Sequence, residues 1–131
     1  MKYILMMNGK KADFDAYTKW SKEDLQKNFT FMRAFSKELK DSGVFVTTEG
    51  LGFPDQAKIV RAGKDGLPVT DGVFPESKEF LAGYWIIDVK SAEEAYRIAA
   101  RVSAAPAPGG APGSMPIEVR QVMGGFDDYG L

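Results

Sequence analysis

The feature that most constrains the fold is an apolar stretch at residues 81–89, which is rich in aromatic and β-branched side chains. Such residues favour a β-strand, and no helix-capping residue precedes the stretch. Alternate side chains of a strand point to opposite faces, so Trp85 and Ile87 share one face while Tyr84 and Ile86 share the other. A solvated face would therefore expose a large apolar patch. We expect helices to cover one face and a second subunit or a ligand to cover the other.

Apolar runs bounded by turn residues predict the remaining strands. These strands are expected at residues 2–8, 44–49, 57–61 and 117–122. The first is apolar on both faces, as expected of a central strand, and Asn8-Gly9 is expected to end it. Residues 63–66 predict a hairpin tip, and residues 67–70 predict a short connecting segment that leads into the long apolar strand.

Two helices are predicted, at residues 21–42 and 91–101. Each opens on a serine, Ser21 or Ser91, that is followed three residues later by an acidic residue, which resembles a capping box. A helical stop is expected at the glycine that follows the first helix. Residues 13–20, which contain three aromatic side chains, are expected to form a loop.

Apolar spacing predicts which side of each helix faces the sheet. The expected inward residues of the first helix are Leu25, Phe29, Met32, Ser36 and Leu39, with Phe35 at the edge. Those of the second helix are Ala92, Ala95, Tyr96, Ala99 and Val102. Phe31 falls off the first stripe, so we expect it to face a partner subunit or a cavity.

The order strand, helix, two or three strands, helix, strand predicts an α+β fold: a ferredoxin-like antiparallel sheet with two helices on one face. The 131 residues fit a single domain that spans residues 1–131. Two helices can cover only one face of such a sheet. Pairing of identical apolar faces across a two-fold axis is the commonest way to cover the other, so we expect a homodimer.

Composition excludes several classes of function. The 17 basic and 18 acidic residues nearly balance, which argues against nucleic-acid binding. The chain contains no cysteine and no histidine, so thiol chemistry, disulfides and imidazole general bases are ruled out. The sequence predicts no metal site and no cofactor. It shows no signal-peptide pattern and no membrane-spanning segment, and a soluble, cytoplasmic, bacterial-type protein is expected.

Residues 71–79 read D-G-V-F-P-E-S-K-E and are followed by Leu81, Gly83 and Tyr84. This segment resembles the D-G-P-F-x-E-x-K-E motif of the YCII-related, DGPF-domain family, with Val73 in place of the motif's proline. The similarity continues in Asp88 and Ala95 and at residues 1–3, 99–101 and 117–120. The resemblance implies a ferredoxin-like domain that usually pairs into a dimeric α+β barrel. Some relatives are encoded beside or fused to sigma factors, and the histidine and aspartate pair attributed to others is not available here.

The motif and the strand that follows it supply the candidate site residues, together with Phe31 of the first predicted helix. Asp71 and Glu76 are the candidate catalytic carboxylates, and Phe31, Lys78, Tyr84 and Trp85 are the candidate substrate-binding residues. A carboxylate whose pKa is raised by burial could act as a general base in proton transfer next to a carbonyl. The structural interpretation of Asp71 is favoured over this one, because an Asp-Gly pair is typical of an Asx-turn. If the segment is extended, Glu76 and Lys78 point to one side.

Two functions remain open. The first is a homodimeric small-molecule-binding protein, with isomerase-like or lyase-like proton transfer through a carboxylate as its candidate activity. The second is a non-enzymatic accessory or regulatory module that binds a protein, with a transcription factor such as a sigma factor as the candidate partner. A cavity of about 300 Å³ or more with a buried carboxylate would favour the first, and a filled core with an exposed apolar groove would favour the second.

Overall fold

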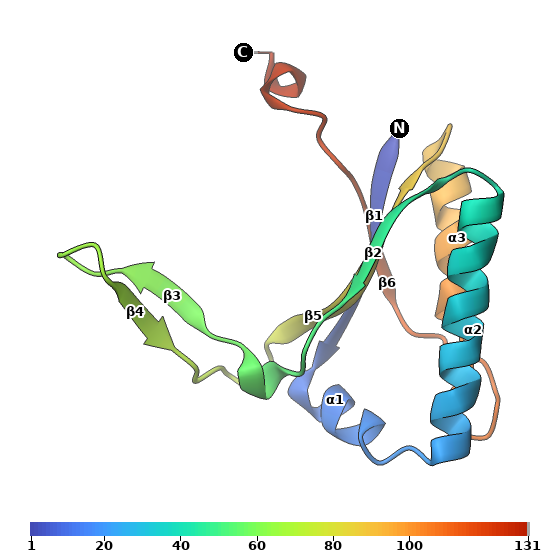
Figure 1. Cartoon of the computed structure of the whole chain (residues 1–131), viewed down its shortest axis with the longest axis horizontal. Helices are drawn as coiled ribbons and strands as arrows, with labels where there is room; N and C mark the ends of the chain where they lie inside the picture. The colour runs from blue at the N-terminus through green and yellow to red at the C-terminus, as the bar shows by residue number, and fades with distance from the viewer. Residues whose placement is uncertain (131) are drawn as a thin grey trace.

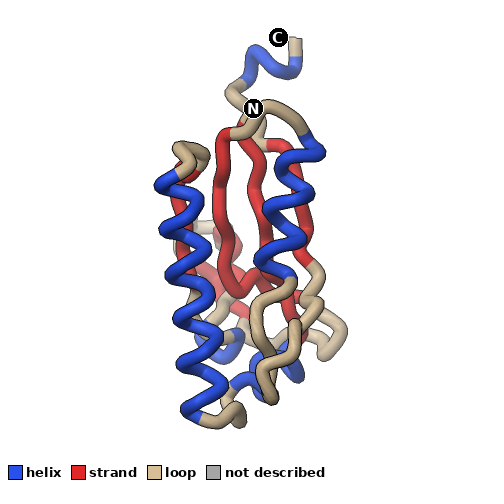
Figure 2. Tube along the Cα trace, turned by 90° about the vertical axis from the view of Figure 1, so that its right-hand side faces the viewer, coloured by secondary structure: helices blue, strands red, loops and turns tan. Residues whose placement is uncertain are grey.

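The computed structural model describes residues 1–130, and within them a four-stranded sheet forms the centre of the fold. Its strands are β1 (Lys2–Lys10), β2 (Phe45–Gly50), β5 (Glu79–Asp88) and β6 (Ile117–Gln121). They run antiparallel in the order β2-β5-β1-β6. The helices α2 (Lys22–Asp41) and α3 (Ala92–Ser103) lie side by side on one face of this sheet (Figures 1 and 2). The prediction of a ferredoxin-like α+β fold with two helices on one face is confirmed.

The two central strands show the expected alternation. Leu5 of β1 lies opposite Trp85 of β5, and both side chains are buried beneath the helices. Ile4 lies opposite Ile86 and points to the other face, where both are only half-buried. A bulge between Met7 and the next residue interrupts the β1–β5 ladder without ending it.

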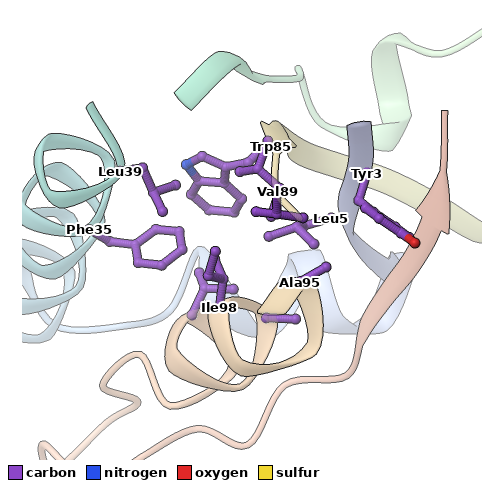
Figure 3. Close-up of a cluster of buried hydrophobic side chains, with 11 residues drawn as sticks. Tyr3, Leu5, Phe35, Leu39, Trp85, Val89, Ala95 and Ile98 are labelled. Atoms are coloured by element: carbon purple, nitrogen blue, oxygen red, sulfur yellow. The ribbon is translucent and has the colours of Figure 1, made fainter. Parts of the chain in front are cut away.

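A hydrophobic core fills the space between the sheet and the helices (Figure 3). Phe35 of α2 meets the Trp85 ring edge-on, with the ring centroids 5.2 Å apart. The indole Nε1 of Trp85 donates a hydrogen bond of 3.1 Å to Oγ of Ser36. Leu39 packs in the same cluster as these two rings and is only 1% exposed (Figure 3). A pairing of large rings thus fixes how α2 lies on the sheet.

The helix starts form as predicted, and the helix faces do so in part. Oγ of Ser21 accepts the N–H of the third residue of α2, and Oγ of Ser91 does the same for α3. On α2 the predicted stripe holds for Leu39, which is buried, and for Met32, which packs against the core, but Phe29 is 48% exposed and Phe35 is central rather than at the edge. On α3, the predicted inward residue Tyr96 is 55% exposed. The residues buried on α3 are Ala95, Ile98, Ala99 and Val102, a regular helical stripe.

Residues 13–20 were expected to be a loop, and this prediction is wrong. Residues Lys11–Tyr17 form a short helix, α1. The carboxylate of Asp13 accepts the backbone N–H of Lys10, which satisfies a free donor at the helix start. Phe14 is buried, and its ring contacts the Phe53 ring edge-on. β1 also continues past Asn8-Gly9 to the start of this helix, because β5 is long enough to pair with it there.

A second, two-stranded sheet extends from the body of the protein. Its strands are β3 (Ile59–Ala62) and β4 (Pro68–Asp71), and we call this hairpin the arm. The short 3-10 turns η1 (Pro54–Gln56) and η2 (Phe126–Tyr129) precede the arm and follow β6, respectively. The arm projects to the side of the main sheet that the helices leave free (Figure 1). No helix of the described residues is both long enough and apolar enough to cross a membrane.

Candidate functional site

The sheet face opposite the helices carries an apolar band. Ile4 and Met6 of β1 lie beside Ile86 and Tyr84 of β5, and all four side chains are half-buried. We call these four residues the open face. Sheets with one solvated face normally place polar side chains there, so an apolar band of this kind is the mark of a surface that binds something.

Polar side chains border the open face on both outer strands. On β6, Arg120 lies opposite Ile4 and Glu118 lies opposite Met6. On β2, Thr47 lies opposite Ile86 and Glu49 lies opposite Tyr84. Nδ2 of Asn8 donates a hydrogen bond of 3.2 Å to Oε1 of Glu118. The surface therefore has an apolar centre with hydrogen-bonding groups at each edge, which is the usual composition of a small-molecule site.

The arm and the C-terminal segment both leave the body on the side of the open face (Figure 1). All eight residues of β3 and β4 are exposed. They include Ile59, Val60 and Val69, and Leu67 at the turn is also exposed. An isolated two-stranded hairpin is at best marginally stable in water. The arm thus presents apolar side chains for which the single chain offers no cover.

The candidate catalytic carboxylates lie at the base of the arm. Oδ1 of Asp71 accepts the backbone N–H of Val73 at 2.9 Å, which is the geometry of an Asx-turn. The segment is not extended here, since the N–H of Lys78 bonds to the carbonyl oxygen of Pro75 and Glu76 lies in the resulting turn, so the condition for Glu76 and Lys78 to share one side is not met. Both Asp71 and Glu76 are exposed in the single chain, so neither lies in a water-excluded pocket.

The candidate binding residues lie in three separate places. The ammonium of Lys78 lies 5.0 Å from the centroid of the Phe80 ring, close to the arm. Phe31 stacks on Phe35 in the helix layer at 6.5 Å, and Trp85 is 5% exposed in the core. Of these candidates, only Tyr84 belongs to the open face.

Sequence reasoning did not find the pair of Asn8 and Glu118, which are 110 residues apart. The alternation of the last strand places Glu118 opposite the apolar side of that strand, but the strand order that brings it to Asn8 is a tertiary property.

Burial raises the pKa of the Tyr17 phenol above its ordinary value of 10.0, so this group stays protonated near neutral pH. Among the described side chains, no group of three or more acidic residues is placed to hold a metal ion.

Asparagine in place of Asp71 is expected to keep the turn, because its amide oxygen can accept the same N–H. The Asp71→Asn protein should therefore match the wild type in unfolding free energy to within about 0.5 kcal/mol. In Asp71→Ala the amide of Val73 loses its partner, and its hydrogen exchange should become several-fold faster. Amide hydrogen exchange followed by NMR measures both the unfolding free energy and the exchange rate of the Val73 amide. Loss of an identified activity in a folded Asp71→Asn protein would instead make this carboxylate catalytic.

Comparison with known proteins agrees with the geometry. A search of curated protein sequences gives no match to this chain. The model of one protein family, described as the YCII-related domain, matches residues 1–125. That span contains the whole four-stranded sheet, both long helices and the arm. The resemblance noted in the motif at residues 71–79 is thereby confirmed along nearly the full sequence, and the chain belongs to the YCII-related domain family.

Proposed function

We propose that this member of the YCII-related family is a homodimer that binds a small molecule at the open face of its sheet. The observation that carries the proposal is the apolar band of Ile4, Met6, Tyr84 and Ile86, which neither α2 nor α3 covers. An uncovered apolar band at the centre of a sheet is costly in water, because each Å² left exposed forgoes about 25 cal/mol of stabilisation.

A second copy of the chain is the cover that best fits this surface. Two sheets pack face to face about 10 Å apart, and two four-stranded sheets together approach an eight-stranded barrel, whose interior holds side chains or one small ligand. Burying several hundred Å² of apolar surface per subunit contributes several kcal/mol, enough to offset the cost of association. The arm, with its exposed apolar residues, projects on the same side and is available to reach the partner.

The border of the open face points to the ligand's chemistry. The apolar centre suits a flat or compact apolar body, and Tyr84 provides a ring on which it can stack. Glu118 and Glu49 lie at opposite edges of the band and favour hydrogen-bond donors on the ligand, and Arg120 on the β6 edge favours an acceptor. If the site also transfers protons, Glu118 is the carboxylate best placed to do so, since a partner would desolvate it beside Asn8.

Protein recognition is the second candidate function. It is favoured by the arm, where Val60, Leu67 and Val69 are more than half exposed with no cover from the described chain. A partner protein could bury these residues instead of a second copy. The two candidates therefore differ in what the purified protein does alone: a small-molecule site formed between copies requires self-association, whereas an accessory module does not.

Light scattering on a sizing column tests the proposal, and the expected mass is about twice the 14.4 kDa of one chain. Ile86→Glu should give monomers, since pairing would bury an unpaired carboxylate. Tyr96→Glu adds the same charge at an exposed apolar position of α3 and should remain dimeric. Native mass spectrometry of freshly purified protein should detect a retained small molecule in wild type and not in Ile86→Glu. A wild-type mass of one chain would reject the dimer and favour the protein-recognition function.

A further inference from the structure

A groove on the helix side of the protein has the composition of a second binding site. It lies between α2 and the edge strand β2, on the opposite side of the sheet from the open face, and has a volume of about 370 Å³. Its lining residues are Met32, Arg33, Ser36, Lys37, Lys40, Thr48 and Trp85. The volume falls within the range of sites that bind small molecules. A partner that pairs at the open face would leave this groove accessible.

The groove is positively charged although the chain as a whole is not. Arg33, Lys37 and Lys40 follow one another at helical spacing along one side of α2, and no acidic residue lines the groove. The net charge of the whole chain is −1, so the excess of positive charge is local. Lys37 is paired with Asp41 at 2.7 Å. Among the side chains that the structure describes, Arg33 has no ion-pair partner, and it is available to a ligand.

Unlike Lys37, the groove residues Arg33 and Lys40 differ from an ordinary solvated helix surface, and the start of α2 provides the comparison. Near its start, Lys27 pairs with Glu23 at 3.3 Å, one turn away, so positive and negative charges alternate. At the groove, the ammonium of Lys40 lies 4.9 Å from the centroid of the Phe45 ring rather than against a carboxylate. This contact orders the side chain and leaves its charge unneutralised.

The floor of the groove offers an apolar wall and an oriented hydroxyl. Oγ of Ser36 accepts the indole N–H of Trp85 at 3.1 Å, so the hydroxyl's own hydrogen remains for a ligand. Oγ1 of Thr48 donates to the carbonyl oxygen of Tyr84 at 2.8 Å, which leaves its lone pairs free. Met32 contributes a polarisable side chain that adapts to flat molecules.

We propose that this groove binds a small molecule that joins an anionic group, a carboxylate or a phosphate, to a flat apolar body. Arg33 and Lys40 hold the anion, and Ser36 donates a hydrogen bond to it. The apolar body lies against Met32 and the indole edge of Trp85. The border of the open face carries Glu49 and Glu118 together with Arg120 and lacks the excess of positive charge found in the groove, so the two sites differ in the charge that they favour.

NMR of the 15N-labelled protein tests this directly, with sodium benzoate as the probe. The chain has two tryptophans, and Trp20→Phe assigns the remaining indole N–H resonance to Trp85. Benzoate should shift the Trp85 resonance saturably and leave that of Trp20 in place. Benzyl alcohol has no charge and inorganic phosphate has no apolar body, so each should bind at least about tenfold more weakly at matched ionic strength.

Charge-removing variants separate the groove from a general effect of charge. The double variant Arg33→Gln with Lys40→Gln should weaken benzoate binding by about tenfold or more. The control, Lys22→Gln with Lys27→Gln, removes the same charge from the same helix outside the groove and should change the affinity by less than about twofold. The proposal is overturned by the absence of a saturable Trp85 shift. Equal binding of benzyl alcohol or phosphate, or equal weakening by the control, also overturns it.

Discussion

Replacing Leu39 with alanine is expected to lower the free energy of unfolding by about 2–5 kcal/mol. Leu39 is 1% exposed and packs in the same core cluster as Phe35 and Trp85, whose rings are held in an edge-on contact (Figure 3). Because these rings are locked by each other and by the Trp85 hydrogen bond to Ser36, they cannot move to fill the space that the lost side chain leaves. Urea unfolding should therefore show a lower midpoint with an unchanged slope.

Phe29→Ala is the matched control for this prediction. Phenylalanine is larger than leucine, and both residues lie on α2, yet Phe29 is 48% exposed. Its removal should cost less than about 1 kcal/mol. A larger loss of stability in Phe29→Ala than in Leu39→Ala would mean that α2 turns a different side toward the sheet.

Gly83→Ala is expected to destabilise the protein by about 1–3 kcal/mol, although alanine is ordinarily the better strand residue. A Cβ at position 83 would lie 2.9 Å from the backbone oxygen of Glu49 on the neighbouring strand. The obstacle is backbone rather than a flexible side chain, so β2 must move away from β5. The hydrogen bond from Leu51 to the carbonyl oxygen of Ala82, at 2.8 Å, is then the first to weaken.

Gly50→Ala isolates this effect, because Gly50 lies directly opposite Gly83 in the same ladder. A Cβ at position 50 would have no neighbour within 4 Å. Because alanine is the better strand residue, Gly50→Ala is expected to leave the free energy of unfolding unchanged or raise it by up to about 1 kcal/mol. Thermal unfolding and hydrogen exchange at the Leu51 amide measure the contrast. Similar behaviour of the two variants would show that the β2–β5 spacing is not limited by this contact.

The elements that sequence predicted well depend on local signals. The serine caps at Ser21 and Ser91 and the β-branched run at residues 81–89 act within a few residues, and the structure contains both helices and the strand. The buried face of each helix was predicted less well, because it depends on which side chains of the sheet the helix packs against. Phe35 is central because Trp85 is there to receive its ring, and the spacing along α2 alone does not reveal this.

The candidate site likewise depends on contacts between distant parts of the chain, which local signals in the sequence do not predict. Residues close together in the motif were expected to act together, but the turn at Glu76 and the alternation of β5 separate them. Tyr84 and Trp85 are neighbours in sequence and point to opposite sides of the sheet. The border pair of Asn8 and Glu118 arises only from the pairing of β1 with β6, and a single sequence does not specify that pairing.

The arm also changes how the main sheet must assemble. β2 and β5 are antiparallel neighbours, so residues 51–78 together form the loop of one long hairpin. Each doubling of loop length costs about 0.6 kcal/mol of chain entropy, which makes closing this loop roughly 2 kcal/mol harder than closing a two-residue turn. If the Gly63–Gly66 turn and the β3–β4 ladder form first, much of that segment is already folded back on itself. An early-forming arm would then speed the closure of the β2–β5 pair, giving this hairpin a kinetic role in folding.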